Sequence, residues 1–312
     1  MTPFAFVFPG QGSQAVGMLD AWGDHAAVRD TLAEASQALG EDIGALIAQG
    51  PKEQLDLTTN TQPVMLTAGV ACLRAWLAET GLRPAVVAGH SLGEYTALVA
   101  AGALTLADAL PLVRFRAQAM QEAVPVGAGG MAAILGLDAA AVREGCAEAA
   151  AAVGEAVEAV NFNDPKQTVI AGTRAAVEKA CEVLKAMGAK RALLLSVSAP
   201  FHSSLMKPAA ERLKERLQAT AFATPAIPVI NNIDVAVQTD AAAIRDALYR
   251  QAFGPVRWVE TIQAIHARGI SHVLECGPGK VLAGMVKRIE PEATGAPVFD
   301  PATLAEAKGM LS

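Results

Sequence analysis

The chain has 312 residues, of which 52% are hydrophobic and 18% are charged, and its formal net charge is −6. This composition excludes a disordered chain, and an acidic balance without any block of Lys or Arg argues against nucleic acid as a partner. At this length a single core stops growing efficiently, so we expect a large domain that carries a smaller inserted or appended one.

The N-terminus has no cationic segment of the signal-peptide type and passes directly into a short apolar run, residues 4–8, that predicts a strand. The apolar stretch at residues 85–113 is interrupted by charged residues and proline, so it does not predict a membrane span. We therefore expect a cytoplasmic protein without a membrane partner.

The cysteines are widely separated and form no C-x-x-C pair, which predicts buried, reduced thiols rather than a zinc site or a disulfide framework. They are Cys72, Cys146, Cys181 and Cys276.

The first predicted strand is followed by a glycine-rich loop in which Gln11 lies between two glycines. Glycine neighbours let the Gln11 backbone approach a ligand closely, so its N–H is a candidate donor to an oxyanion. An alternative is a dinucleotide-binding fingerprint, because Gly10, Gly12 and Ala15 fit G-x-G-x-x-A after a strand. Residues 30–38 predict a helix where that motif needs a second strand ending in an acidic residue, so we discount it.

The sharpest local signal is a G-x-S-x-G sequence at residues 89–93, between an apolar strand at 85–88 and a helical run at 94–101. Such a tight turn projects its serine, here Ser91, at the carboxyl edge of a sheet, where it can act as a nucleophile. The helix dipole and unpaired N–H groups would support an oxyanion there, and the Leu92 N–H is the nearest donor. The alternative is a structural turn in which the serine only caps the helix.

Arg116 lies on an apolar face of the next predicted helix, residues 107–124. An unpaired guanidinium on a buried face costs several kcal/mol, so Arg116 needs an anionic partner. One alternative is an internal ion pair with Asp or Glu. The other is a bidentate clamp on a substrate carboxylate, which a carboxylated acyl group would satisfy.

The middle of the chain predicts a separate unit with the element order βαββαβ, which is ferredoxin-like. Its strands and helices are expected at residues 131–135, from 138 onward, at 157–162, 168–171, 173–187 and 192–197. The flanking segments alternate strands with helices, which indicates a mostly parallel sheet covered by helices. We therefore predict an α/β fold with a large subdomain at 1–126 and 198–312 and an inserted subdomain at 127–197.

A serine nucleophile needs a general base, and histidine is the usual choice. The chain has five: His25, His90, His202, His266 and His272. His202 is predicted in a loop that follows the last strand of the insert. His90 neighbours the serine in a turn that would point its ring elsewhere, and His266 falls in a helical pattern. Spacing alone leaves the choice between His202 and the other four open.

Taken together, several motifs resemble the malonyl-CoA:acyl carrier protein transacylases of fatty acid synthesis. The matching segments are 10–14, 89–94, Arg116 with 120–121, 161–163, 199–202, Gln251 ahead of 254–256, and 276–282. The match runs from about residue 4 to residue 289. It implies an α/β-hydrolase-like large subdomain with a mostly parallel sheet and a ferredoxin-like insert, in agreement with the elements predicted above.

The resemblance implies that Ser91 is the nucleophile, His202 the general base and Arg116 the clamp on the malonyl carboxylate. Family members use a Ser-His dyad with a main-chain carbonyl as the third member, which would explain why no acid for a triad is evident.

Three further roles come from the same resemblance. The backbone N–H groups of Gln11 and Leu92 would form the oxyanion hole, and Gln251 would orient the histidine. Phe201 resembles the malonyl-selecting form of its loop, in which a bulky ring crowds an α-methyl group.

The implied reaction is ping-pong transfer through an acyl-serine, from malonyl-CoA to the phosphopantetheine thiol of acyl carrier protein, without a metal or redox cofactor. We expect a monomer whose partners are these two substrates. Weak candidates for a basic surface that docks the carrier are Lys185, Lys190, Arg191, Lys280, Lys287 and Arg288. A serine hydrolase or thioesterase of the same fold is the main alternative, and a non-catalytic carrier-binding module is a second.

Overall fold

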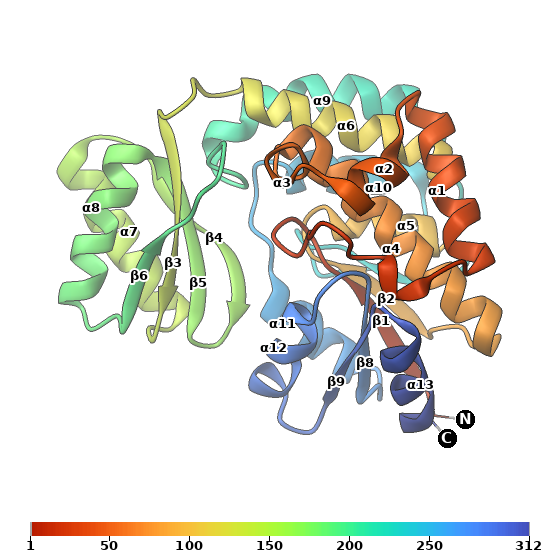
Figure 1. Ribbon diagram of the computed structural model, residues 1–312. Helices are drawn as coiled ribbons and strands as arrows, with labels where there is room; N and C mark the ends of the chain where they lie inside the picture. Colours follow the sequence, from red (N-terminus) through yellow and green to blue (C-terminus); the bar gives the residue numbers. More distant parts are fainter. Residues whose placement is uncertain (1, 312) are drawn as a thin grey trace.

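The computed structural model describes residues 2–311 and contains two separate sheets (Figure 1). Sheet A has five strands in the order β7-β2-β1-β8-β9, and all its neighbours pair in parallel. Its strands are β1 (Phe4–Phe8), β2 (Val86–Gly89), β7 (Val229–Ile230), β8 (His272–Cys276) and β9 (Thr294–Val298). The predicted α/β class with a mostly parallel sheet is confirmed.

Sheet A is buried between helices because its strands are apolar on both faces. All five residues of β1 are buried, as parallel strands with two covered faces require. One face packs against α4, where the Trp76 ring lies 5.4 Å from the Phe6 ring at 82°. The helices outside the insert are η1 (Asp20–Trp22), α1 (Ala26–Leu39), α2 (Ile43–Gln49), α3 (Lys52–Leu55), α4 (Thr58–Thr80), α5 (Gly93–Ala100), α6 (Leu106–Glu122), η2 (Ser204–Met206), α9 (Lys207–Ala219), α10 (Ala241–Gln251), α11 (Trp258–His266), α12 (Val281–Ile289) and α13 (Pro301–Met310).

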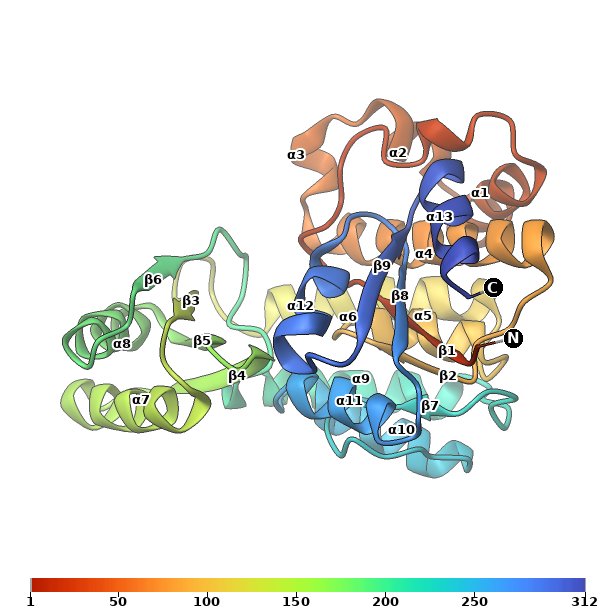
Figure 2. The same cartoon turned by 90° about the horizontal axis from the view of Figure 1, so that it is seen from below.

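Sheet B has four antiparallel strands in the order β4-β5-β3-β6, and two helices cover one of its faces (Figure 2). Its elements are β3 (Gly129–Leu135), α7 (Ala139–Val153), β4 (Val157–Asp164), β5 (Gln167–Thr173), α8 (Arg174–Ala186) and β6 (Arg191–Leu194). The predicted βαββαβ order is therefore present along the chain. Asp138 and Thr173 begin the two helices by accepting hydrogen bonds from the N–H groups of Ala141 and Ala176.

The last strand of the insert is shorter than predicted. The apolar run suggested a strand at residues 192–197, but β6 ends at Leu194 and pairs only with β3. Leu193 and Leu194 are exposed at this sheet edge, so the apolar run here does not mark a buried strand. Residues 195–197 instead leave the sheet and line the cavity described below.

Sheet B is tied to the rest of the chain through the edge strand β4. The Phe162 N–H donates to the Val256 carbonyl at 3.0 Å, and the Val256 N–H donates to the Val160 carbonyl at 2.8 Å. The Arg288 guanidinium adds a hydrogen bond of 2.9 Å to Asp164 at the end of the same strand. These contacts fix β4 beside sheet A, while the subdomain boundaries at residues 127 and 197 stay a prediction.

Two expectations about composition can be compared with the described residues. The four cysteines are all buried and free, as the sequence predicted. No helix between residues 2 and 311 is both long enough and apolar enough to span a membrane.

Candidate active site

The turn between β2 and α5 places Ser91 at the carboxyl edge of sheet A with a left-handed backbone, φ 53°. The flanking glycines are required by close approaches of the backbone. A Cβ on Gly89 would lie 1.9 Å from the Gly93 carbonyl carbon, and a Cβ on Gly93 would lie 2.1 Å from the Phe8 carbonyl oxygen. The G-x-S-x-G pattern therefore follows from the geometry of the turn.

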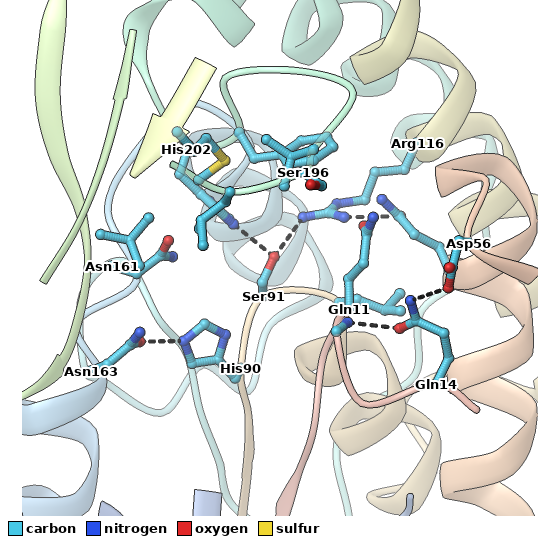
Figure 3. Close-up of a pocket in the computed structure, with 18 of the residues that line it drawn as sticks. Gln11, Gln14, Asp56, His90, Ser91, Arg116, Asn161, Asn163, Ser196 and His202 are labelled. Atoms are coloured by element: carbon cyan, nitrogen blue, oxygen red, sulfur yellow. Dashed lines mark hydrogen bonds between the residues drawn. The ribbon is translucent and has the colours of Figure 1, made fainter. Parts of the chain in front are cut away.

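His202 lies directly against the serine, with its Nε2 atom 2.7 Å from Ser91 Oγ (Figure 3). On the other side of the ring, Nδ1 lies 2.9 Å from the Gln251 carbonyl oxygen and 3.2 Å from that of Gly254. Because both groups only accept hydrogen bonds, Nδ1 carries the proton and Nε2 is free to accept from the serine hydroxyl. Burial, with the nearby Arg116 charge, lowers the pKa of His202 to about 3. The ring is therefore a neutral base at physiological pH.

The other histidines are placed differently. The His90 ring lies in the same cavity, but its Nε2 donates to Asn163 Oδ1 at 2.8 Å instead of contacting the serine. Burial lowers the pKa of His90 as well. His25 and His266 lie near the carboxylates of Glu79 and Glu292, away from the cavity. Of the five histidines, only His202 contacts Ser91.

Arg116 is 2% exposed and points at the serine from α6. Its Nη2 donates to Ser91 Oγ at 3.2 Å and to Gln251 Oε1 at 3.1 Å, while Nη1 donates to Gln62 Oε1 at 2.9 Å. Within residues 2–311 no carboxylate lies within 4.0 Å of it, so the internal ion pair considered above is wrong. Burial lowers the pKa of Arg116. A buried cation with neutral partners beside a nucleophile is suited to an anionic ligand.

Two backbone N–H groups face the cavity near the serine. Gln11 and Leu92 both line it, and neither N–H donates to an acceptor among the described residues. Leu92 stands at the start of α5, where the helix dipole favours negative charge. The Gln11 side chain turns away from the serine and donates to Thr58 Oγ1 at 3.1 Å. Both residues therefore offer N–H groups without a protein acceptor at the cavity, which makes them candidate donors to an oxyanion.

The cavity has a volume of about 490 Å³ and lies between the carboxyl edge of sheet A and one face of sheet B. Phe201 lines it beside the histidine and packs against the apolar residues of sheet B. Met131 and Val169 add apolar surface from sheet B, and Asn161 adds an amide. The wall that faces the serine therefore combines apolar side chains with the amides of Asn161 and Asn163.

Gln251 approaches the histidine through its backbone rather than its side chain. Its carbonyl oxygen accepts from His202, and its buried amide reaches Arg116, the Ser91 carbonyl and Glu94. The contact by which Gln251 was predicted to orient His202 is thus made by its main-chain carbonyl. The hydrogen bonds of the Gln251 side chain were not predicted from the sequence.

Two buried polar residues of the site were missed from the sequence. Asn232 accepts the Ser91 N–H at 2.8 Å and donates to the Gly89 carbonyl at 2.7 Å, and so braces the turn. Glu94 accepts from the Asn232 N–H at 2.8 Å, and burial raises its pKa to about 7. The available signals were a lone carboxylate in an apolar helical run and a pair of asparagines after β7, of which Asn232 is the second.

Comparisons with known proteins agree with this geometry. Residues 5–299 match the family described as "Acyl transferase domain". The chain is 54% identical to the malonyl CoA-acyl carrier protein transacylase of Salmonella typhimurium, over 98% of this chain and 99% of that one. A crystal structure of an acyl-carrier-protein S-malonyltransferase from Burkholderia pseudomallei aligns with a TM-score of 0.96 and 68% identity, covering 98% and 99% of the two chains. A type II PKS acyl-carrier protein in complex with its malonyl-transacylase aligns with a TM-score of 0.96 and 50% identity, covering 98% and 99%.

Proposed function

The chain belongs to the acyl transferase domain family, and we propose that it moves a malonyl group from malonyl-CoA to acyl carrier protein, supplying extender units for fatty acid synthesis. One observation carries the choice of acyl group. The Arg116 guanidinium lies 3.2 Å from the nucleophile and has no carboxylate partner among residues 2–311. A malonyl carboxylate at that guanidinium would bring the thioester carbon to Ser91.

In the first half-reaction Ser91 Oγ attacks the thioester carbonyl while His202 Nε2 takes its proton. The backbone N–H groups of Gln11 and Leu92 would stabilise the oxyanion. Collapse of the tetrahedral intermediate breaks the carbon–sulfur bond, and the protonated histidine returns its proton to the leaving CoA thiolate. The malonyl group is then an ester on Ser91.

The second half-reaction runs the same steps in reverse with a new thiol. His202 takes the proton of the phosphopantetheine thiol, and the sulfur attacks the carbonyl of the acyl-serine. The ester C–O bond then breaks, the histidine returns the proton to Ser91 Oγ, and the malonyl-carrier thioester leaves. Each step uses a residue of this chain, so the proposal assigns no metal or redox cofactor. Because the pKa of His202 is lowered to about 3, the ring is neutral at the start of each half-reaction.

Phe201 is proposed to favour malonyl over branched extender units. Its ring lines the cavity next to His202 and packs against sheet B. An α-methyl group on the acyl chain would meet this ring and the apolar wall behind it.

Carrier protein is the proposed acceptor, and the exposed basic side chains singled out from the sequence are candidates for docking it. Lys280, Lys287 and Arg288 are exposed at the start and in the last turn of α12, and Arg288 also bonds Asp164. Lys185, Lys190 and Arg191 are exposed on the side of sheet B. Such groups would attract an acidic partner or the phosphate of its prosthetic arm. A monomeric, cytoplasmic enzyme is part of the same proposal.

Intact-mass measurement tests the function directly. Wild type and Ser91→Ala would be incubated briefly with malonyl-CoA and then with pantetheinylated carrier protein. We expect a malonyl increment on wild type alone, which the carrier then discharges. Release of free malonate without an acceptor would favour the hydrolase or thioesterase. Absence of any adduct would overturn the acyl-serine, and carrier binding without turnover would favour the non-catalytic module.

A further inference from the structure

A buried carboxylate, Glu94, lies behind the nucleophile turn and outside the substrate cavity. It stands in the first turn of α5, is 2% exposed and is absent from the cavity lining. One of its oxygens, Oε2, accepts from the Asn232 N–H at 2.8 Å and from Gln251 Nε2 at 3.0 Å. Glu94 therefore connects the nucleophile turn to two segments that are distant from it in sequence, the one that contains Asn232 and the one that contains Gln251.

The Gln251 side chain has a defined orientation because of its acceptors. Its Nε2 group donates to Glu94 Oε2 and to the Ser91 carbonyl, both at 3.0 Å. The amide oxygen is then turned to Arg116, whose Nη2 donates to it at 3.1 Å. A flipped amide would place its NH2 group against the guanidinium, so that two donors faced each other in a buried place.

This arrangement makes the position of the arginine depend on a residue that does not touch it. The guanidinium donates hydrogen bonds to Gln62, Gln251 and Ser91, and it also lies 5.5 Å from the centroid of the Tyr95 ring. The charge of Glu94 acts on it at longer range. The Nη2 group that reaches the nucleophile is also the one that the Gln251 amide holds. Loss of the Glu94 acceptor would free that amide to flip and release Nη2 from its position beside Ser91.

We propose that Glu94 is a positioning residue, which holds the Gln251 amide and, through it, sets Arg116 for binding the malonyl carboxylate. The inference rests on the proposed function. It differs from a purely structural role in one respect, because it concerns recognition of the acyl carboxylate and not folding alone.

The test compares Glu94→Met with Glu94→Gln. Methionine keeps the length of the side chain but has no comparable acceptor, while glutamine removes the charge and keeps an acceptor oxygen. The measured quantity is kcat/KM for formation of the acyl-serine from malonyl-CoA, divided by the value for acetyl-CoA. We expect Glu94→Met to lower this ratio about tenfold or more, and Glu94→Gln to restore it to within about threefold of wild type.

Glu275→Met is the matched control. Glu275, in β8, is also a fully buried glutamate, and burial raises its pKa to about 7 as well. Its carboxylate accepts the Ala283 N–H at 2.8 Å at the start of α12 and contacts neither Gln251 nor Asn232. We expect this variant to lower Tm while the malonyl-to-acetyl ratio stays at the wild-type value.

An unchanged ratio in Glu94→Met would overturn the inference, as would an equal fall in the ratio for Glu275→Met. Should Glu94→Met not fold, Gln251→Met provides the test, since it deletes the amide and keeps the carbonyl that contacts His202. An unchanged ratio in that variant would also overturn the inference. A wild-type enzyme that forms no malonyl adduct would instead reject the proposed function, so the two failures are distinguishable.

Discussion

The two walls of the cavity are built in different ways. The wall at the carboxyl edge of sheet A carries the polar groups of Ser91, His202 and Arg116. Ser91 and His202 have positive φ angles, and Arg116 is a buried cation without a carboxylate within 4.0 Å among the described residues. The facing wall, from sheet B, is formed mainly by apolar side chains such as Met131 and Val169. Hydrogen bonds fix the first wall atom by atom, whereas close packing shapes the second.

This difference assigns chemistry to one wall and fit to the other. A substitution on the sheet A side removes a group that transfers a proton or stabilises charge, and the loss of one such group lowers the rate about a hundredfold or more. A substitution on the sheet B side changes the space available to the acyl chain, and it alters the preference between two acyl groups by about ten- to a hundredfold. The five predictions below test this division, from the largest expected effect to the smallest.

Removal of the base should have the largest effect. His202→Ala deletes the only histidine that contacts Ser91 within the described chain. We expect the rate of acyl-serine formation to fall about a thousandfold or more with the fold retained. Stopped-flow release of CoA measures the rate, and circular dichroism checks the fold. A loss of less than about tenfold would reject His202 as the base.

Arg116→Ala should lower malonyl transfer about a hundredfold and spare acetyl transfer, because only the malonyl group carries a carboxylate for the guanidinium. The ratio of kcat/KM for malonyl-CoA and acetyl-CoA is the readout. Arg114→Ala is the matched control, since that arginine pairs with Glu41 at the surface of the same helix. An unchanged preference in Arg116→Ala would rule out the clamp.

A change in the apolar packing against sheet B should affect fit alone. Phe201→Ala removes the ring beside the base, so we expect methylmalonyl-CoA to gain about tenfold relative to malonyl-CoA. Competition between the two thioesters, followed by mass of the acyl-enzyme, gives the relative use. If Phe201→Ala lost malonyl transfer to the same extent as His202→Ala, the ring would be needed for the reaction itself and not only for the choice of acyl group.

Gln11→Ala should cost only a few-fold in rate, because the proposed donor is the backbone N–H and the variant keeps it. The lost side-chain contact is one hydrogen bond to Thr58. Steady-state transfer of malonyl to carrier protein measures the change. A variant as inactive as Ser91→Ala would show that the side chain itself takes part.

Lowering the pH should have no effect on the protonation of His202 over the range in which histidine usually titrates. Burial and Arg116 lower its pKa to about 3 from the ordinary 6.5, so the folded protein keeps it neutral from pH 8 to about pH 5. The histidine of the unfolded chain binds a proton near pH 6.5, whereas the buried ring of the folded protein does not. The free energy of unfolding therefore falls as the pH drops below 6.5. Ring ¹⁵N shifts of labelled histidine, assigned with His202→Ala, follow the titration. A ring that protonates above pH 6 would contradict the prediction.

Much of the fold followed from local patterns in the sequence. Apolar runs gave β1 at its observed bounds and β2 to within one residue, because buried parallel strands are continuous in hydrophobicity. The end of β6 could not be predicted in this way. Three consecutive leucines suggested a longer strand, and only the structure shows that all three are exposed and that the strand ends at the second of them.

The site was predictable where a residue has an unusual chemical context in its own segment. Ser91 in its turn and Arg116 on an apolar helix face were such cases. His202 was not, because five histidines were available and the contact spans 111 residues of chain. Asn232 and Glu94 act through partners more than 130 residues away, at separations of 141 and 138 residues, and no local pattern encodes such pairings.

Ser91 and His202 have φ angles of 53° and 66°, a backbone region that a serine or histidine occupies at a cost. Each such residue costs the folded state about 1 kcal/mol or more, which glycine would not incur. The reacting pair thus weakens the protein that carries it. In a protein that no longer needed the acyl-transfer reaction, replacing Ser91 or His202 by glycine would remove this backbone cost. Retention of both residues in a sequence therefore indicates that the reaction is still required.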